Sequence, residues 1–401
     1  MNREQQRLVV KCPAIYTMDR IISGGIYIEN NIIKAILDDD ALKNINYKDV
    51  KTYSFPKDYK IIPGIIDIHV HGLMGVDTMD GNLDVFNRMC EHLPEEGVTA
   101  FLATTITSDD KTTKKTLSLI NNFMSQKNDN GASLLGINLE GPFISKERAG
   151  AHNKALVLHP DIDIFDEWQY ISGNNIKIVT IAPELPGAFD FIKQYRDSVV
   201  LSLGHTNCSY EVACHAIDCG VRHATHLFNA MSGIEHRTPG AALAVLLTAN
   251  DMLSEIIVDK IHLHEVVVQL IYKLLGKERI VLISDAMRAK GLREGVYEFG
   301  GSKIFVDKYA ARLQDGTLAG SLLKMNNAIK NMVEITRVSL SDVISMTSKN
   351  PARLLNIYNK KGSIDIGKDA DIVVLDNSFN VAMTIAMGNI VYINDEQDCN
   401  K

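Results

Sequence analysis

Six residues of types that bind metal ions stand at intervals along the central part of the chain. Two form a His-x-His motif, and each of the others lies at or near the end of a short apolar run; the six are His69, His71, Glu140, His205, His226 and Asp285. Imidazole and carboxylate groups without thiolates suit zinc, iron or another divalent first-row ion. Such an ion can polarise an amide carbonyl and lower the pKa of a bound water molecule. The residue types therefore indicate metal-dependent amide hydrolysis, with Asp285 as the candidate general base and then acid.

These residues need elements that bring them together, and the central part of the chain has a repeating pattern that can do so. Between Ile61 and about Leu355, apolar runs alternate with longer amphipathic stretches; the runs span residues 61–70, 98–104, 134–140, 176–184, 199–205, 221–230, 254–259 and 280–286. Runs that are apolar throughout are typical of parallel strands covered on both faces. Eight β–α units in about 290 residues predict a (β/α)8 barrel of the TIM type, with an open doubly wound sheet as the alternative.

A barrel of parallel strands would gather the candidate ligands at one mouth, because active sites form where the strands end. His69 and His71 are two residues apart on the first predicted strand, so their side chains point to the same side. The other four fall at the ends of the third, fifth, sixth and eighth strands. A single histidine at a strand end is more often a hydrogen-bonded structural residue. Six ligand-type residues at five strand ends would be costly to bury unpaired, so we predict a metal site.

The two ends of the chain follow a different pattern, with short strands and glycine turns. The run GGIYIENNIIKAI at 24–36 alternates and has Glu-Asn-Asn at its centre, which predicts a β-hairpin. Residues 361–395 hold further short strands without helical periodicity. We therefore expect one small β domain built from residues 1–60 and 359–401, around a barrel domain of residues 61–358.

Three of the six cysteines fall in or beside one predicted helix. The cysteines are at positions 12, 90, 208, 214, 219 and 399. The stretch 209–220 has a helical period that would place Val212, His215, Ala216 and Cys219 on one face. No two cysteines form a Cys-x-x-Cys motif. We expect reduced structural thiols in a cytoplasmic protein.

The overall composition is that of an ordinary globular protein, with 46% hydrophobic and 23% charged residues. A formal net charge of -7 and the lack of a basic run argue against nucleic-acid binding. An anionic small-molecule substrate is still compatible with this charge, because a cationic pocket can be local. We find no signal-peptide pattern at the N-terminus and no run of roughly 18 apolar residues of the kind that spans a membrane.

Eight segments spread over nearly the whole chain match one known family. They are PGIIDIHVHG (63–72), LEGPFIS with AGAHN (139–153), GHTNCS (204–209), ATHLFNAM (224–231), HRTPG (236–240), SDAM (284–287), LAGS (318–321) and GKDADIVVLD (367–376). In these segments the chain resembles the N-acetylglucosamine-6-phosphate deacetylases of the amidohydrolase superfamily. The first and last segments occur across the superfamily, whereas LEGPF, AGAHN, ATHLFNAM and LAGS are more specific to the sugar-phosphate deacetylases.

The resemblance implies a fold, a metal centre and a reaction. The fold is a (β/α)8 barrel with a small β-sandwich, commonly in a homodimer. Glu140, His205 and His226 would hold the principal ion, and Asp285 would be the catalytic acid and base. Only some family members keep the His-x-His motif, and those can hold a second ion. We therefore expect one or two divalent ions per subunit, with Glu140 placed to bridge them.

Six further residues match substrate contacts of the family, and they are His152, Asn229, Ala230, Arg237, His262 and Leu318. The first matches a histidine that contacts the sugar or the reacting group, and the last lies in a loop at the acetyl-binding end. Asn229 and Ala230 match contacts to the phosphate. Arg237 matches a phosphate-binding arginine, a task that suits its planar fork, with a surface salt bridge as the alternative.

His262 matches a histidine that contacts the sugar, and the loop before it differs from the family. Lys260 stands where the family usually has glycine, followed by Ile261. A lysine in place of glycine could change the backbone geometry of this loop, and with it the sugar that the enzyme prefers.

The resemblance implies hydrolysis of N-acetylglucosamine 6-phosphate to glucosamine 6-phosphate and acetate. One alternative keeps the scaffold and changes the substrate to N-acetylgalactosamine 6-phosphate or another N-acyl compound. Another is a non-catalytic relative that serves as a binding or scaffolding protein. The complete set of candidate ligands argues against the latter, because such relatives typically lose ligands.

Overall fold

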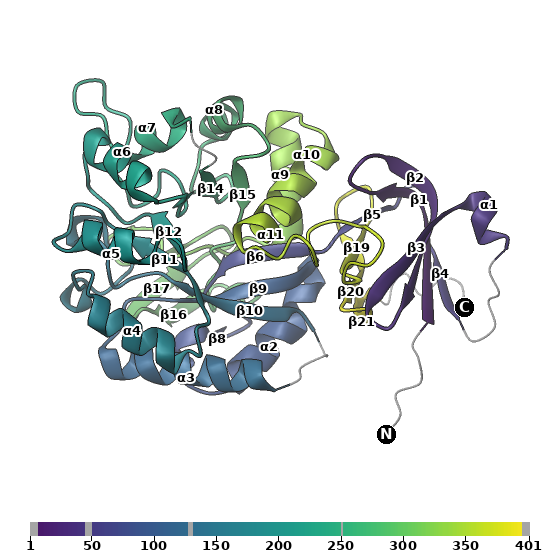
Figure 1. The fold of residues 1–401 in the computed structure, drawn as a ribbon, viewed down its shortest axis with the longest axis horizontal. Helices are drawn as coiled ribbons and strands as arrows, with labels where there is room; N and C mark the ends of the chain where they lie inside the picture. The colour runs from purple at the N-terminus through teal and green to yellow at the C-terminus, as the bar shows by residue number, and fades with distance from the viewer. Residues whose placement is uncertain (1–6, 45–49, 127–130, 250–251, 395–401) are drawn as a thin grey trace.

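The structure, a computed structural model, describes residues 7–44, 50–126, 131–249 and 252–394. It has two parts: a larger one in which helices surround a sheet, and a smaller sheet at one end that contains strands from both ends of the chain (Figure 1).

Eight parallel strands form the centre of the larger part. In order around the sheet they are β6 (Ile65–Val70), β9 (Val98–Thr105), β10 (Ser133–Leu139), β11 (Ile176–Ile181), β12 (Val200–Leu203), β13 (His223–Ala224), β14 (Leu253–Ile256) and β15 (Ile280–Leu282). The segment after β15 returns to β6 through a parallel bridge between Ala286 and Val70 and a 2.9 Å hydrogen bond from the Asp285 amide to the His69 carbonyl. The sheet is therefore a nearly closed barrel. This confirms the predicted (β/α)8 fold and excludes the open sheet.

Helices follow the strands and cover the outside of the barrel (Figure 1). The main ones are α2 (Asp84–His92), α3 (Asp110–Ser125), α4 (Ile162–Ile171), α5 (Ala188–Tyr195), α6 (Tyr210–Cys219), α7 (Ala241–Leu247), α8 (Glu265–Leu275) and α9 (Met325–Thr336). The short helices α10 (Leu340–Ile344) and α11 (Asn350–Leu354) end the larger part.

Helix α6 occupies the predicted residues. On the predicted face Ala216 is buried, Val212 and Cys219 are half-buried against the core, and His215 is exposed. The His215 ring lies against Phe189 of the neighbouring helix α5, 4.7 Å between ring centres. The buried side chains of α6 are Ala213, Ala216 and Ile217, so small alanines let the helix pack closely and Ile217 is its large core residue.

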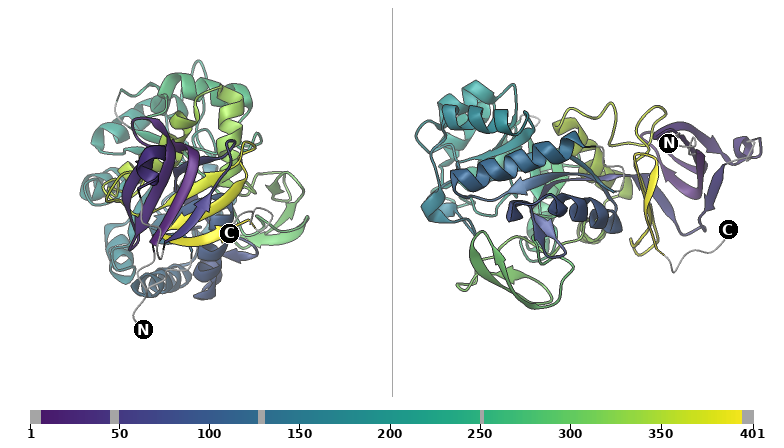
Figure 2. Two further views of the ribbon diagram at one scale, coloured as in Figure 1. Left: turned by 90° about the vertical axis from the view of Figure 1, so that its right-hand side faces the viewer. Right: turned by 90° about the horizontal axis from the view of Figure 1, so that it is seen from below.

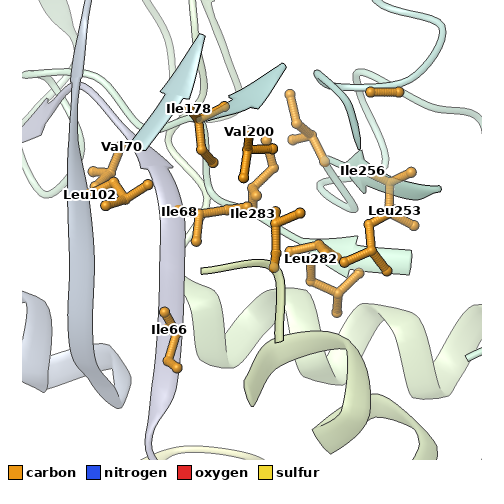
Figure 3. Close-up of a cluster of buried hydrophobic side chains, with 14 of the residues drawn as sticks. Ile66, Ile68, Val70, Leu102, Ile178, Val200, Leu253, Ile256, Leu282 and Ile283 are labelled. Carbon is orange, nitrogen blue, oxygen red and sulfur yellow. The ribbon is translucent and has the colours of Figure 1, made fainter. Parts of the chain in front are cut away.

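The barrel core is aliphatic, and its alternation explains which way the candidate ligands point. Ile66, Ile68 and Val70 on β6 are at most 1% exposed and belong to the buried cluster drawn in Figure 3. Complete burial of such a side chain contributes about 1.5–3 kcal/mol. Because side chains alternate along a strand, the residues between them, Asp67 and His69, point to the opposite side.

The smaller part is one mixed sheet that joins both ends of the chain. Its order is β21 (Asn389–Ile393), β20 (Val381–Ala386), β19 (Ile372–Leu375), β5 (Lys60–Pro63), β1 (Arg7–Tyr16), β2 (Ile21–Glu29) and β3 (Ile32–Asp38), with β4 (Lys51–Ser54) also paired to β1. Strands β2 and β3 form the predicted hairpin, and its turn residues Asn30 and Asn31 have φ of 51° and 71°. A joint β part from both ends is confirmed, while the exact domain limits stay predictions.

A three-stranded antiparallel sheet between β15 and α9 was not predicted. It consists of β16 (Gly295–Phe299), β17 (Ser302–Val306) and β18 (Ala311–Arg312). In the right-hand view of Figure 2 these green strands stand off from the barrel. A separate small core that includes Ile304 and Ala319 holds the sheet in place.

The five cysteines in the described part of the chain are free, and Cys399 lies outside the described residues. No helix in the described ranges is both long enough and apolar enough to cross a membrane.

Candidate metal centre and active site

Glu140 lies at the centre of the barrel mouth, directly after β10, and both oxygens of its carboxylate face imidazoles. Its Oε1 atom is 2.9 Å from Nε2 of His226 and 3.0 Å from Nε2 of His205. Its Oε2 atom is 3.1 Å from Nε2 of His71. Nε2 of His69 lies 3.5 Å from Oε1. One buried carboxylate is thus shared by four histidines from three different strand ends.

Asp285 completes a second group of ligand atoms beside the first. Its Oδ1 atom is 3.4 Å from Nε2 of His69 and 3.3 Å from Nε2 of His71. The candidate ligands form two buried clusters, one of His69, His71 and Asp285 and one of Glu140, His205 and His226, and the ligand atoms within each lie within 4.8 Å of one another. All six residues that the sequence singled out therefore meet at one place.

Three of these residues have a left-handed backbone, which turns their side chains from the strand ends into the mouth. The φ angles are 46° at His205, 27° at His226 and 48° at Asp285. This conformation costs a residue other than glycine roughly 1–2 kcal/mol. Such strain persists only where surrounding contacts impose it, and it concentrates at functional sites.

The hydrogen bonds behind the rings show that the site suits cations. Nδ1 of His205 donates to the Arg148 carbonyl at 2.8 Å, and Nδ1 of His69 donates to Oε2 of Glu255 at 3.0 Å. A neutral imidazole that donates from Nδ1 has a lone pair on Nε2. In both rings Nε2 faces carboxylate oxygens, and the buried Nε2 of His69 has no hydrogen-bond partner among the described residues. A cation between nitrogen and oxygen satisfies both groups, so the donor set fits a divalent metal.

The pKa values within the cluster reflect the same excess of negative charge. Burial alone would lower the pKa of His71, but its hydrogen bonds to Asp285 and Glu140 and their charges raise it to about 9. Burial opposes the ionised form of Asp285, yet the charges of His69 and His71 hold its pKa below the ordinary value. When no metal ion is bound, the cluster therefore holds protons that a metal ion must displace.

His152 differs from the ligand histidines because burial lowers its pKa to about 4, so the ring is neutral near neutral pH. Its Nδ1 accepts a hydrogen bond from the Thr107 amide at 3.2 Å and lies 2.8 Å from the Thr107 hydroxyl. The proton of the neutral ring is therefore on Nε2, which points at Oε2 of Glu140, 3.4 Å away. Gly141 permits this approach, because a Cβ atom there would lie 2.1 Å from the Thr107 hydroxyl.

A cavity of about 840 Å³ opens above the metal clusters. Five of the six predicted substrate contacts line it, namely His152, Asn229, Ala230, His262 and Leu318. Arg237 does not line this cavity. It lies in the exposed loop 233–238, and within the described residues only its amide makes a hydrogen bond, to the neighbouring Glu235 side chain at 3.4 Å. The structure thus brings together all the predicted site residues except Arg237.

The loop before His262 keeps a glycine-like geometry although it contains lysine. Lys260 has φ of 66°, a left-handed conformation that glycine adopts without strain. Its ammonium group pairs with Glu334 at 3.3 Å and with Glu265 at 3.6 Å. The next residues are held by Asp259, whose Oδ2 atom accepts a hydrogen bond from Nδ1 of His262 at 2.7 Å. Nε2 of His262 is thereby left for the cavity.

Several residues of the site were missed from the sequence. Arg148, Lys154 and Arg312 bring positive charge to the cavity wall, and the ring of Phe299 from β16 lies 5.1 Å from that of His71. The three cations are unremarkable surface types, and no sequence signal marks them. Glu255 did leave a signal, because it is a charged residue inside the otherwise apolar run 254–259.

Comparisons with known proteins agree with this geometry. Residues 61–391 match the amidohydrolase family. The N-acetylglucosamine-6-phosphate deacetylase of Bacillus subtilis (strain 168) is 40% identical over 396 residues, 98% of this chain and 99% of that protein. The N-acetylgalactosamine-6-phosphate deacetylase of Escherichia coli O157:H7 is 36% identical over 331 residues, 82% of this chain and 87% of that protein.

Solved structures are similar over nearly the whole chain. The N-acetylglucosamine-6-phosphate deacetylase from Pasteurella multocida superposes with a TM-score of 0.89 at 28% identity, covering 97% of this chain and 100% of that one. An aspartate-to-alanine mutant of the Mycobacterium smegmatis enzyme, in complex with N-acetyl-D-glucosamine-6-phosphate, gives the same TM-score of 0.89 at 28% identity, with 97% and 100% coverage. This chain belongs to the amidohydrolase family and, within it, to the N-acetylglucosamine-6-phosphate deacetylases.

Proposed function

We propose that this chain is a cytoplasmic enzyme of amino-sugar metabolism that hydrolyses N-acetylglucosamine 6-phosphate to glucosamine 6-phosphate and acetate. The observation that carries the proposal is the pair of ligand clusters around Glu140, which lies beside a neutral histidine at the floor of a cavity. The similarity to deacetylases over 98% of the chain supports the choice of substrate.

We propose two divalent ions per subunit, zinc, iron or another first-row metal. Glu140, His205 and His226 would hold the principal ion, and the His-x-His motif with Asp285 the second. When bound, such ions supply Lewis acidity toward the amide carbonyl and toward water. Glu140 would contribute to both ion sites, because its Oε1 atom faces His226 and its Oε2 atom faces His71.

Asp285 is proposed to move the proton during hydrolysis. It lines the cavity, and its pKa lies below the ordinary value despite burial, so it begins the reaction as a base. It would take a proton from the attacking water molecule and later give it to the leaving amine. The atoms then balance: the C–N bond breaks, the hydroxyl goes to the acetyl carbon and the proton goes to nitrogen.

His152 is proposed to act as a neutral hydrogen-bond donor toward the acetyl oxygen. Thr107 fixes its Nδ1 as the acceptor, so Nε2 carries the proton and faces the centre. Negative charge develops on that oxygen as water attacks, and a donor already in position stabilises it.

The remaining contacts are proposed to set the substrate's position. Asn229 and Ala230 would bind the phosphate, helped by the positive charge of Arg148 on the cavity wall. His262 would bind a sugar hydroxyl, and Leu318 would contact the acetyl methyl group.

We further propose a homodimer in which the exposed loop of Arg237 approaches the phosphate of a neighbouring subunit. Helix α8 carries an apolar stripe at four-residue spacing, with Val266, Leu270 and Leu274 exposed by 62%, 39% and 44%. Leu247 at the end of the adjoining helix α7 is 56% exposed. A contiguous apolar face on a globular protein marks an interaction surface. The loop of Arg237 precedes α7 in the chain, and we propose that it belongs to the same interface.

Substrate choice is tested by comparing kcat/KM for the two epimeric sugar phosphates. Loss of one hydrogen-bonded hydroxyl costs about 1–3 kcal/mol, so we expect N-acetylglucosamine 6-phosphate to be favoured by at least about fivefold. N-Acetylglucosamine without phosphate serves as the control and should react poorly. A ratio of about four or less would leave the named substrate unsupported.

Asp285→Asn should lower kcat by about 10²–10⁴-fold, because the amide has the same shape but cannot shuttle the proton. KM and the principal ion should be retained, as measured by steady-state kinetics and by elemental analysis. Asp190→Asn on the exposed surface of α5 is the matched control and should behave like the wild type. A nearly normal kcat for Asp285→Asn would place the base elsewhere.

Metal binding should release protons, because His71 has a pKa of about 9 in the metal-free site. Below this pH the ring is protonated and competes with the metal ion, so apparent affinity for the second ion should rise about tenfold per pH unit up to about pH 9 and then level off. Calorimetry in two buffers of different ionisation enthalpy at about pH 7 should count roughly one proton or more per second ion. Binding without proton release would show that His71 is not a ligand.

Arg237→Ala should raise KM by about 10–100-fold with little change in kcat, because a charged hydrogen bond to phosphate is worth about 1.5–3 kcal/mol. Coexpression with Asp285→Asn subunits should restore activity at low substrate, since one site of the mixed dimer has both an intact Asp285 and an intact Arg237. The two variants purified separately and never mixed are the control. If the mixed dimer does not regain activity at low substrate, Arg237 does not act across the interface.

A further inference from the structure

Glu255, on strand β14, lies behind the proposed second ion and is not one of the predicted ligands. It is 0% exposed. Its Oε2 atom accepts hydrogen bonds from Nδ1 of His69 at 3.0 Å and from the His226 amide at 3.1 Å. The same carboxylate oxygen therefore holds the ring of one candidate ligand and the backbone of another, from two different strands.

The hydrogen bond to Glu255 determines which nitrogen of the His69 ring carries the proton. A carboxylate oxygen can only accept, so His69 donates from Nδ1 and directs the lone pair of Nε2 toward Glu140 and Asp285. A negative carboxylate behind an imidazole also makes the ring a stronger ligand. If Nδ1 had no acceptor, the other tautomer would point a proton at the cation position.

The charge of Glu255 has no cationic side chain to balance it. Within the described residues, its ion-pair contacts are with histidines alone, His69 and His223. Its Oε1 atom lies 3.7 Å from the buried Nε2 of His223, and neither atom has a hydrogen-bond partner in the part of the chain that the structure describes. A buried carboxylate in these surroundings is costly unless positive charge lies nearby.

We infer that Glu255 is a positioning residue for the second metal ion, because it fixes the tautomer and orientation of His69 and supplies negative charge behind it. This inference rests on the two-ion form of the proposed function. Since Glu255 also holds the His226 amide, it joins the ligand of the second ion to the strand end that carries a ligand of the principal ion.

A second carboxylate–histidine pair in the same mouth offers a control. Asp259 accepts from Nδ1 of His262 at 2.7 Å, a geometry like that of Glu255 and His69. His262 belongs to neither ligand cluster. Asp259→Asn removes a charge from the same kind of pair without touching a candidate ligand, so it should leave the number of bound ions unchanged.

The test measures metal content and affinity in the full-length protein with Glu255→Gln and Glu255→Leu. Glutamine keeps the shape and one acceptor but loses the charge, and we expect the second ion to bind about 10–100-fold more weakly while the principal ion is unchanged. Leucine also removes the acceptor, and this variant should hold the principal ion only. In Co²⁺-loaded protein the absorption bands of the second ion should shift in the glutamine variant, and the Nδ1–H resonance of His69 should move.

The outcomes separate the inference from the function on which it rests. If the wild type binds one ion only, the proposed second site is wrong. If the wild type binds two ions and both Glu255 variants bind two with unchanged affinity and unchanged Co²⁺ bands, the inference is wrong and the second site stands. Should Glu255→Leu fail to fold, the affinity and spectrum of the isosteric Glu255→Gln variant decide the question.

Discussion

Negative charge that no lysine or arginine neutralises is the constraint on which this barrel mouth depends. Glu140, Asp285 and Glu255 are buried, and their ion-pair partners in the described part of the chain are all imidazoles. Carboxylates buried in this way need positive charge in the same place, from protons on the rings or from metal ions between ligand atoms. A metal ion between the ring nitrogens and the carboxylate oxygens would take the place of those protons. The buried negative charge therefore explains both the affinity of the site for metal ions and the protons that a metal ion must displace.

The strained strand ends are held by a second layer of contacts below the site. Asp67, beside His69 on β6, accepts a hydrogen bond from the Ser284 hydroxyl at 2.5 Å. Burial raises the pKa of Asp67 to about 6. The Ser321 amide, from the LAGS segment, donates to the Asp285 carbonyl at 2.7 Å. These bonds clamp the segment of Asp285 from both sides, which is how a left-handed aspartate can be kept in one position.

The sequence predicted the barrel and the ligands for different physical reasons. The eight strands lie in largely apolar runs, and that pattern is local, so it can be recognised along the chain. The six ligands could be grouped because a parallel barrel brings strand ends together whatever the details of packing. Glu255 could not be assigned this way, since its role depends on a ring 186 positions away in the sequence. Helical periodicity placed His215 on the same face of α6 as Ala216, but it could not show that His215 is exposed, because that depends on the neighbouring helix α5. Arg237 was predicted as a phosphate contact from its sequence motif. A motif does not show whether a residue in an exposed loop lines the cavity of its own subunit, and Arg237 does not line it.

The sheet of β16–β18 separates the part of the enzyme that can vary from the part that cannot. It is a sheet of its own, not paired with the barrel strands, yet Phe299, Gly300 and Gly301 from its first hairpin line the cavity. Insertions or deletions in this hairpin would reshape the wall that meets the substrate without shifting the register of any barrel strand. Changes in this hairpin, in nature or by design, could therefore alter the substrate toward bulkier acyl groups or other sugars. The metal ligands and Asp285 lie on other elements and would not change.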